Sequence, residues 1–127
     1  MSSTTALHVA AEVLQIFRQL CAEKMEKQDV PPNMVVVFAE IAANPDRSLR
    51  EYQEATGLGQ AVMSRSVAAL GRGNQAMGHG LGLVTTAEDP TNYSRKIVSL
   101  TSEGTALLER IDEQLGRFVR TRPAVRA

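Results

Sequence analysis

Side chains that can make directional hydrogen bonds cluster near the middle of the 127-residue sequence. Gln60, Ser64 and Arg65 lie within six residues, and they offer an amide, a hydroxyl and a guanidinium group. Residues 56–87 contain no acidic residue, and Arg65 and Arg72 are their only full charges. The whole chain balances 14 basic against 14 acidic residues. We therefore expect any anion-binding face to use this segment, together with the arginine-rich last twelve residues.

Sequence patterns typical of catalysis are missing. The chain has no glycine-rich phosphate loop, no nucleophile elbow and no His/Asp/Glu set at metal-ligand spacing. His8 and His79 are 71 positions apart, and the single cysteine, Cys21, excludes an internal disulfide and a multi-cysteine metal site. We predict no enzymatic activity, no catalytic residue, no metal ion and no cofactor.

The composition indicates one soluble globular domain over residues 1–127. The hydrophobic fraction is 43% and only five residues are aromatic, so Leu, Val, Ile, Met and Ala must build the core, which favours helices. The chain contains no apolar run of the ~18 residues that a membrane span needs. We expect a cytoplasmic protein that has no membrane partner.

A long first helix is predicted over residues 6–27, and it carries two apolar seams. One seam contains Leu7, Ala10, Leu14, Phe17 and Cys21; the other contains Val9, Val13, Ile16 and Leu20. One seam is enough to dock a helix on its own domain, so the second favours a dimer. The alternative is a central helix that is buried on all sides.

Three further helices are predicted before residue 71. Prolines around residue 31 end the first helix, and a very apolar helix follows over about 33–43. Ser48 and Glu51 fit a capping box for a short helix that runs to about residue 55. Gly57 can take positive φ in the next turn. A helix over 60–70 then has Val62, Val67 and Leu70 as inward positions. Two helices joined by such a turn predict a helix-turn-helix, although an αα-hairpin would look similar.

A β-hairpin and a last helix complete the predicted fold. Residues 71–82 are glycine-rich and irregular, and strands at 83–86 and 96–100 flank a long polar tip over 87–95. Thr101 or Ser102 caps the last helix, whose apolar seam is Leu108, Ile111, Leu115 and Phe118. The predicted class is mainly α with a small β-hairpin. It is a winged helix-turn-helix core over 33–100, with dimerisation helices over 1–30 and 101–122.

From about Ala6 to Leu115, the chain resembles the MarR family of bacterial transcription regulators. The resemblance rests on the order and spacing of Leu49, Ala55-Thr56-Gly57-Leu58, Ser64-Arg65-Ser66-Val67, Leu70, Gly82-Leu83-Val84, Asp89-Pro90 and Val98-Ser99-Leu100-Thr101-Ser102-Glu103-Gly104. It implies a homodimer clasped by the first and last helices, with a recognition helix in the major groove and a wing in a neighbouring minor groove. The clasp residues would be Leu7, Ala10, Leu14, Phe17, Leu108, Ile111, Leu115 and Phe118.

This chain departs from the family pattern in three places. Residues 73–80 make the step from recognition helix to wing strand longer than usual. The family's wing arginine pair is replaced by Tyr93 and Ser94, and Arg95 and Lys96 follow it. The last helix is short. The longer step leaves room for an unusual mode of DNA binding in which residues 73–80 become ordered only when DNA is bound.

In this docking mode, the first turns of the 60–70 helix approach the base edges. The candidate contacts there are Gln60, Ala61, Met63, Ser64 and Arg65. Arg65 can donate two hydrogen bonds to guanine, Gln60 can pair with adenine, and Ser64 is better suited to phosphate. A phosphate contact or a structural ion pair stays open for Arg65. Arg72 is expected to touch a phosphate.

Tyr93, Ser94, Arg95 and Lys96 are the candidate contacts of the wing. Narrow minor grooves concentrate negative potential and attract arginine. The alternative is a solvated hairpin in which Asp89 pairs with Arg95. His79 is expected in an exposed loop and His8 on the surface. Cys21 is expected to be a packed core residue, although peroxide sensing, known for a cysteine in this region of some family members, is its alternative.

The resulting hypothesis is a homodimeric, sequence-specific regulator of transcription that binds double-stranded DNA. It would repress by occluding a promoter at a pseudo-palindromic operator. One alternative is a winged-helix protein-interaction module, which the neutral net charge suits. Another is a regulator that responds to a small ligand or to redox change; the sequence identifies no effector.

Overall fold

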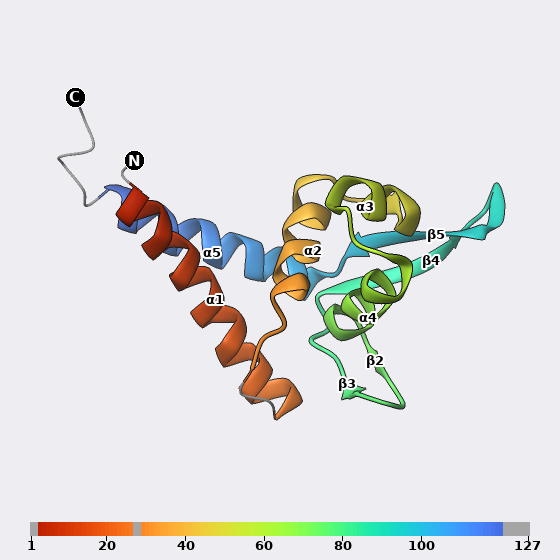
Figure 1. Ribbon diagram of the computed structural model, residues 1–127, viewed down its shortest axis with the longest axis horizontal. Helices are drawn as coiled ribbons and strands as arrows, with labels where there is room; N and C mark the ends of the chain where they lie inside the picture. The colour runs from red at the N-terminus through yellow and green to blue at the C-terminus, as the bar shows by residue number, and fades with distance from the viewer. Residues whose placement is uncertain (1–2, 27–28, 121–127) are drawn as a thin grey trace.

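The computed structural model describes residues 3–26 and 29–120, with backbone alone at residue 3 and at residues 117–120. Its element order is α1 (Ser3–Met25), α2 (Pro32–Ala43), β1 (Arg47–Ser48), α3 (Leu49–Thr56), α4 (Gln60–Leu70), β2 (Gly73–Asn74), β3 (Gly78–His79), β4 (Val84–Asp89), β5 (Asn92–Leu100) and α5 (Ser102–Arg120). Helices α1 and α5 form an arm on one side, and the β4–β5 ribbon projects on the other (Figure 1). None of the described helices is long and apolar enough to cross a membrane.

Local signals in the sequence place α2, α3 and α4 closely. Helix α2 begins at Pro32, directly after the extended Pro31, where proline loses no helical hydrogen bond. The Ser48 side chain accepts from the Glu51 amide at 3.1 Å, and the Glu51 carboxylate accepts from the Ser48 amide at 3.0 Å. The capping box is therefore confirmed. Gly57 has φ +76 and closes α3, as expected from its freedom to take positive φ.

A buried tyrosine fixes the start of β1. Tyr52 is 1% exposed, and its hydroxyl donates to the Asn44 carbonyl at 2.6 Å and accepts from the Arg47 amide at 3.2 Å. Burial raises the pKa of the Tyr52 phenol. Two backbone groups of the link between α2 and α3 thus depend on one side chain.

The sheet differs from the sequence-based prediction in two respects. It has three antiparallel strands in the order β1-β5-β4, and β1, which pairs Arg47 with Val98 and Ser48 with Ile97, was not predicted. The ribbon tip was predicted over 87–95 but consists of Pro90 and Thr91 alone, between Asp89 and Asn92. The Asp89 carboxylate accepts from the Thr91 amide at 2.9 Å and from its hydroxyl at 2.7 Å, which stabilises this tight turn.

Residues 71–82, predicted to be irregular, contain a second, two-stranded ribbon. Strands β2 and β3 pair Gly73 with His79 and Asn74 with Gly78. Gly73 has φ +83 and Gly78 has φ +80, which only glycine adopts without strain. His79 is exposed, as expected, and so is His8.

The core lies between α2, α4 and the sheet, and α1 and α5 dock onto it. Phe17 of α1 is fully buried against Phe38 of α2, with ring centroids 5.5 Å apart in an edge-to-face arrangement. Leu7 is 70% exposed and Leu14 is 44% exposed, so the alternative of an α1 helix buried on all sides is wrong. Lys24 and Glu103 form an ion pair at 2.8 Å that ties the end of α1 to the start of α5; this lysine lowers the pKa of Glu103.

Helix α5 begins against the end of the glycine-rich segment. The Thr101 hydroxyl accepts from the Gly104 amide at 3.0 Å and donates to the Gly82 carbonyl at 2.7 Å, so Thr101 caps the helix as predicted. The Thr101 amide donates to the Leu83 carbonyl at 3.0 Å. A Cβ on Gly104 would overlap that same Leu83 oxygen, so this contact needs glycine.

Candidate nucleic-acid interface

Helix α4 presents a narrow outward face. It packs against α2 and α3 through Met63, Ser66, Val67, Ala69 and Leu70, all of them buried. With 100° between successive residues, the opposite face of the helix carries Ala61, Ser64 and Arg65, with Gln60 at its edge. All four of these residues are exposed.

The prediction that Met63 is a contact residue is wrong. Met63 is 1% exposed and belongs to the core. Met63, Val67 and Leu70 follow the four-three spacing of one helical face, so Met63 points inward with two of the three residues that were expected to do so. The third, Val62, is only half-buried. The apolar character of Met63, read with that spacing, was a signal that could have removed it from the predicted set.

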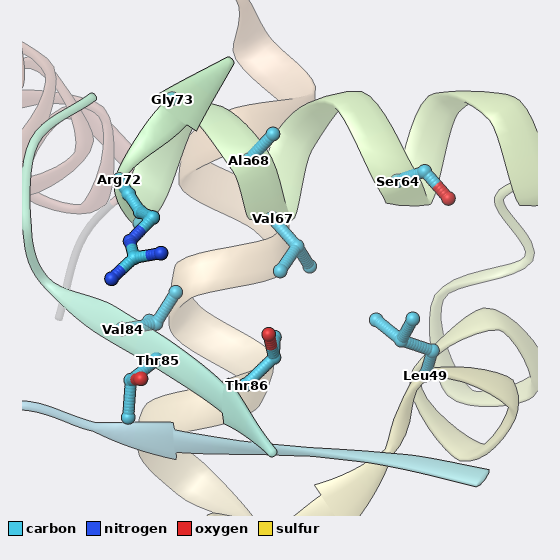
Figure 2. Close-up of a pocket in the computed structure, with 10 residues that line it drawn as sticks. Leu49, Ser64, Val67, Ala68, Arg72, Gly73, Val84, Thr85 and Thr86 are labelled. Atoms are coloured by element: carbon cyan, nitrogen blue, oxygen red, sulfur yellow. The ribbon is translucent and has the colours of Figure 1, made fainter. Parts of the chain in front are cut away.

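A groove follows α4 on the side of the β4–β5 ribbon, which we call the wing. Its first part, of about 680 Å³, lies between α3, the start of α4 and β5. Its second part, of about 370 Å³, lies between the end of α4 and β4, and both parts share Leu49 and Ser64. Figure 2 shows Ser64 and Arg72 at opposite ends of the second part, with the Thr86 side chain of β4 pointing toward α4 and that of Thr85 pointing away from it. The polar residues of this α4–wing groove are Ser48, Arg50, Gln53, Gln60, Ser64, Arg72, Thr85, Thr86, Asn92, Ser94, Arg95 and Lys96.

Three cations at or beside the groove make no ion pair with the described part of the chain: Arg65, Arg72 and Lys96. Lys96 faces Glu88 across the wing without forming one. The structural ion pair that stayed open for Arg65 is therefore not formed. All three side chains are exposed, so they are available to an anionic partner.

Arg95, in contrast, is held by two carboxylates. Its guanidinium lies 2.6 Å from the Glu51 carboxylate and 3.4 Å from that of Asp89. The pairing with Asp89 that the sequence left open is thus present, and the sequence analysis missed the pairing with Glu51. The Ser48 amide and then Arg95 lower the pKa of Glu51 to about 2. Hydrogen bonds from Thr91, and then Arg95, lower the pKa of Asp89.

The remaining wing candidates lie at its exposed end. Tyr93 is 73% exposed. The Ser94 hydroxyl donates to the Asn92 side chain at 2.7 Å, and its amide donates to the same oxygen at 3.2 Å. Tyr93 and Ser94 therefore sit beside the tip, where Pro90 and Thr91 form the turn.

The predicted clasp residues divide into exposed and buried sets. Leu7, Ala10 and Leu14 are exposed along α1, whereas Phe17 is fully buried in its own chain and is not free to meet a partner. On α5, Ile111 is 9% exposed and packs in the core, and Leu108 and Leu115 are half-buried. Phe118 lies outside the residues with described side chains. Phe17 and Ile111 are thus corrected from clasp residues to core residues.

A crevice of about 660 Å³ separates the end of α1 from α4. Cys21, Met25, Met34 and Met77 contribute apolar surface to it, and Arg65 lies on its lining. This volume is in the range of small-molecule sites. The Cys21 thiol is buried and 1% exposed, in agreement with a packed cysteine. Within residues 3–26 and 29–120, no three His, Cys, Asp or Glu residues are grouped to hold a metal ion.

Comparison with solved structures places this arrangement in a known fold class. A structure of the PcaV transcriptional regulator from Streptomyces coelicolor, in complex with its natural ligand, is 24% identical, with a TM-score of 0.55 over 94% of this chain and 79% of that chain. A variant of MarR from E. coli complexed with operator DNA is 18% identical, with a TM-score of 0.58 over 89% and 75%. A variant of MepR from S. aureus bound to an oligodeoxyribonucleotide is 15% identical, with a TM-score of 0.61 over 95% and 81%.

These likenesses show that the chain has the winged-helix fold of MarR-type regulators, as the sequence resemblance predicted. No family model and no curated protein matches the sequence. The mainly α class with a small β-hairpin is likewise confirmed.

Proposed function

We propose that the protein is a sequence-specific transcriptional regulator that binds double-stranded DNA, and that it acts as a homodimeric repressor on a pseudo-palindromic operator. The observation that carries the proposal is the outward face of α4, where Gln60, Ser64 and Arg65 are exposed on a helix whose opposite face is buried in the core. The DNA-bound structures of the same fold support it. Neither a catalytic residue nor a cofactor forms part of the proposal.

Helix α4 would read bases in the major groove. An α-helix with its side chains is about 10–12 Å wide, and the major groove of B-DNA is about 12 Å wide. Arg65 would donate two hydrogen bonds to a guanine and Gln60 would pair with an adenine. Ala61, also exposed on this face, would contact a thymine methyl group. Ser64, at the groove edge, would bind a phosphate.

The α4–wing groove would hold one sugar-phosphate strand. A strand separates the major groove, where α4 would lie, from the minor groove, where the wing would lie. It must therefore pass between these two elements. Arg72 and Lys96 line the groove and make no ion pair with the described residues, and Thr86 adds a hydroxyl donor. Tyr93 and Ser94 would approach the minor groove with the wing tip.

The homodimer would form through the α1–α5 arm. Leu7, Ala10 and Leu14 leave an apolar strip of α1 exposed, and the half-buried Leu108 and Leu115 lie on α5. A two-fold pair of winged domains would then bind half-sites centred about 34–36 Å apart. A promoter that overlaps such an operator would be occluded, which is repression.

Selection of bound duplexes from a random pool, followed by variants, tests the base contacts. Arg65→Ala is expected to lose about 1–3 kcal/mol of discrimination at one base position of the selected site and at its symmetry mate. The matched control is Arg110→Ala, which removes an exposed arginine of α5 and is expected to leave the base preference unchanged. An Arg65→Ala variant with wild-type preference at every position would refute this assignment.

The salt dependence of binding tests the phosphate contacts. Lys96→Ala is expected to weaken binding to every duplex and to reduce the slope of log affinity against log salt by about 0.9. If the wild-type protein binds no duplex in a salt-dependent manner, the DNA-binding proposal fails. A winged-helix protein-interaction module is then the reading that remains.

A further inference from the structure

The wing is fixed to the domain at its root by β1. That strand pairs with β5 only at Ile97 and Val98. From Ile97 toward the tip, the wing is a two-stranded ribbon, and no other strand of the described residues lies beside it (Figure 1). A two-stranded ribbon on its own is only marginally stable, so a second point of attachment would restrict the angle between the wing and α4.

Glu51 supplies that second point. It lies in the first turn of α3, three residues after Ser48, the last residue of β1. Its carboxylate meets Arg95 at 2.6 Å, and Arg95 is two residues closer to the wing tip than Ile97, where the pairing of β1 with β5 ends. The ion pair thus continues the attachment of β5 past the end of β1. Arg95 also reaches Asp89, whose carboxylate forms the tip turn with Thr91. One guanidinium therefore links the helix-turn-helix to the end of the wing.

The carboxylate of Glu51 is itself held in place. It accepts from the Ser48 amide at 3.0 Å as part of the capping box, and Arg47 lies 3.7 Å away. Its side chain is 38% exposed and that of Arg95 is 43% exposed. A fixed carboxylate that meets the planar fork of an arginine restricts the angle of both partners more than a mobile pair does.

An acidic side chain beside the α4–wing groove weakens the attraction of the groove for phosphate. Arg95 lines the α4–wing groove, and Glu51 and Asp89 cancel much of its attraction for phosphate. A residue selected only for affinity to DNA would be neutral or basic at position 51. An acidic residue at position 51 is explained if DNA binding gains more from a fixed wing angle than it loses in attraction between Arg95 and phosphate.

We propose that Glu51 is a positioning residue that sets, through Arg95, the angle between the wing and α4, and that it raises the discrimination between operator and other duplexes while weakening binding to all of them. This inference rests on the proposed DNA-binding function. A duplex that matches the fixed angle can occupy α4, groove and wing together, whereas other duplexes lose part of these contacts. A free wing would adapt to any duplex.

The substitution Glu51→Gln tests the attachment without DNA. Glutamine keeps the acceptor that the capping box needs but removes the charge that holds Arg95. Amide hydrogen exchange of residues 92–97 is expected to become about threefold to fivefold faster, the range expected for loss of a half-exposed ion pair. Arg95→Lys, which keeps the charge but loses the planar fork, is expected to act in the same direction. Glu54→Gln is the matched control, because Glu54 is an exposed acid of the same helix whose one ion pair within the described residues is with Arg50, at 3.9 Å.

The same variants then bind a duplex selected by the wild-type protein and a scrambled duplex. Glu54→Gln is expected to strengthen both complexes by one common factor, through charge alone. Glu51→Gln is expected to strengthen the scrambled complex and to lower the ratio of the two affinities about threefold to tenfold. Unchanged wing exchange in Glu51→Gln and Arg95→Lys, or faster exchange with an unchanged affinity ratio, would overturn the proposal. Should no duplex bind in a salt-dependent manner, the proposed function fails, and the exchange measurement still decides whether Glu51 holds the wing.

Discussion

The variant Tyr52→Phe removes one hydroxyl group, and we expect it to lower the free energy of unfolding although the side chain keeps almost the same volume. The phenylalanine ring fills the same space, so the change isolates the hydroxyl from packing. That hydroxyl pairs with the Asn44 carbonyl at 2.6 Å and the Arg47 amide at 3.2 Å. Each buried backbone group left without a partner costs about 1–3 kcal/mol. Because Asn44 and Arg47 are themselves exposed, water replaces part of the loss, and we expect a total of about 1.5–2 kcal/mol.

Thermal unfolding followed by circular dichroism measures this loss. For a domain of this length, the entropy of unfolding near the midpoint is about 0.27 kcal/mol per kelvin, so the expected drop in Tm is about 5–8 °C. The matched control is Tyr93→Phe, the same substitution at a residue that is 73% exposed, which is expected to change stability by no more than about 0.5 kcal/mol. Both variants are compared at one protein concentration, because a dimer makes Tm depend on concentration. Equal midpoints for the two variants would refute the role given to the Tyr52 hydroxyl.

Three further predictions follow from local contacts. Ser48→Ala is expected to lower the free energy of unfolding by about 1 kcal/mol in chemical denaturation, because the capping hydrogen bond is lost; no loss would contradict the role of the cap. Gly104→Ala is expected to cost at least about 2 kcal/mol, because the new Cβ overlaps the Leu83 carbonyl oxygen and α5 must move away; a wild-type Tm would show that α5 shifts freely. The pKa of Glu51 is about 2 in the folded chain, below its ordinary value of 4.5. Its ionised form therefore stabilises the fold fully above about pH 4.5, and this stabilisation is lost as the pH falls toward about 2. The difference in stability between the wild type and Glu51→Gln is then expected to shrink over that interval, and a constant difference would contradict the assignment.

The sequence predicts elements that short-range signals define. Helix α4 begins and ends at the residues expected, because a turn precedes it and a glycine follows it. The capping box of α3 was also recognisable, since its two partners are three residues apart. Strand β1 was not, because two residues carry no alternating pattern and their pairing with β5 is a long-range contact.

The difference between short-range signals and long-range contacts also separates the correctly predicted site residues from the wrong ones. Helical spacing places Gln60, Ser64 and Arg65 on the outward face of α4, as the structure has them. Phe17 belongs to an apolar seam of α1, but periodicity does not tell whether a seam meets its own chain or a partner, and here it meets α2. Glu51 and Arg95 are 44 residues apart, so their meeting becomes visible only in three dimensions.

The β2–β3 ribbon leaves and rejoins the domain at one place. After it, the chain turns back along the last turn of α4, where the amides of Leu81, Gly82 and Leu83 donate to the carbonyls of Ala69, Gly71 and Leu70 at 2.7–2.8 Å. These hydrogen bonds fix where the chain leaves α4 and where it enters the wing, and they do not depend on the length of the β2–β3 ribbon between them. Residues 74–77 can therefore be lengthened, shortened or exchanged while α4 and the wing keep their spacing. Met77 of this excursion borders the crevice beside Cys21, so such changes would reshape that crevice first. The crevice can therefore vary in evolution while the α4–wing groove stays the same.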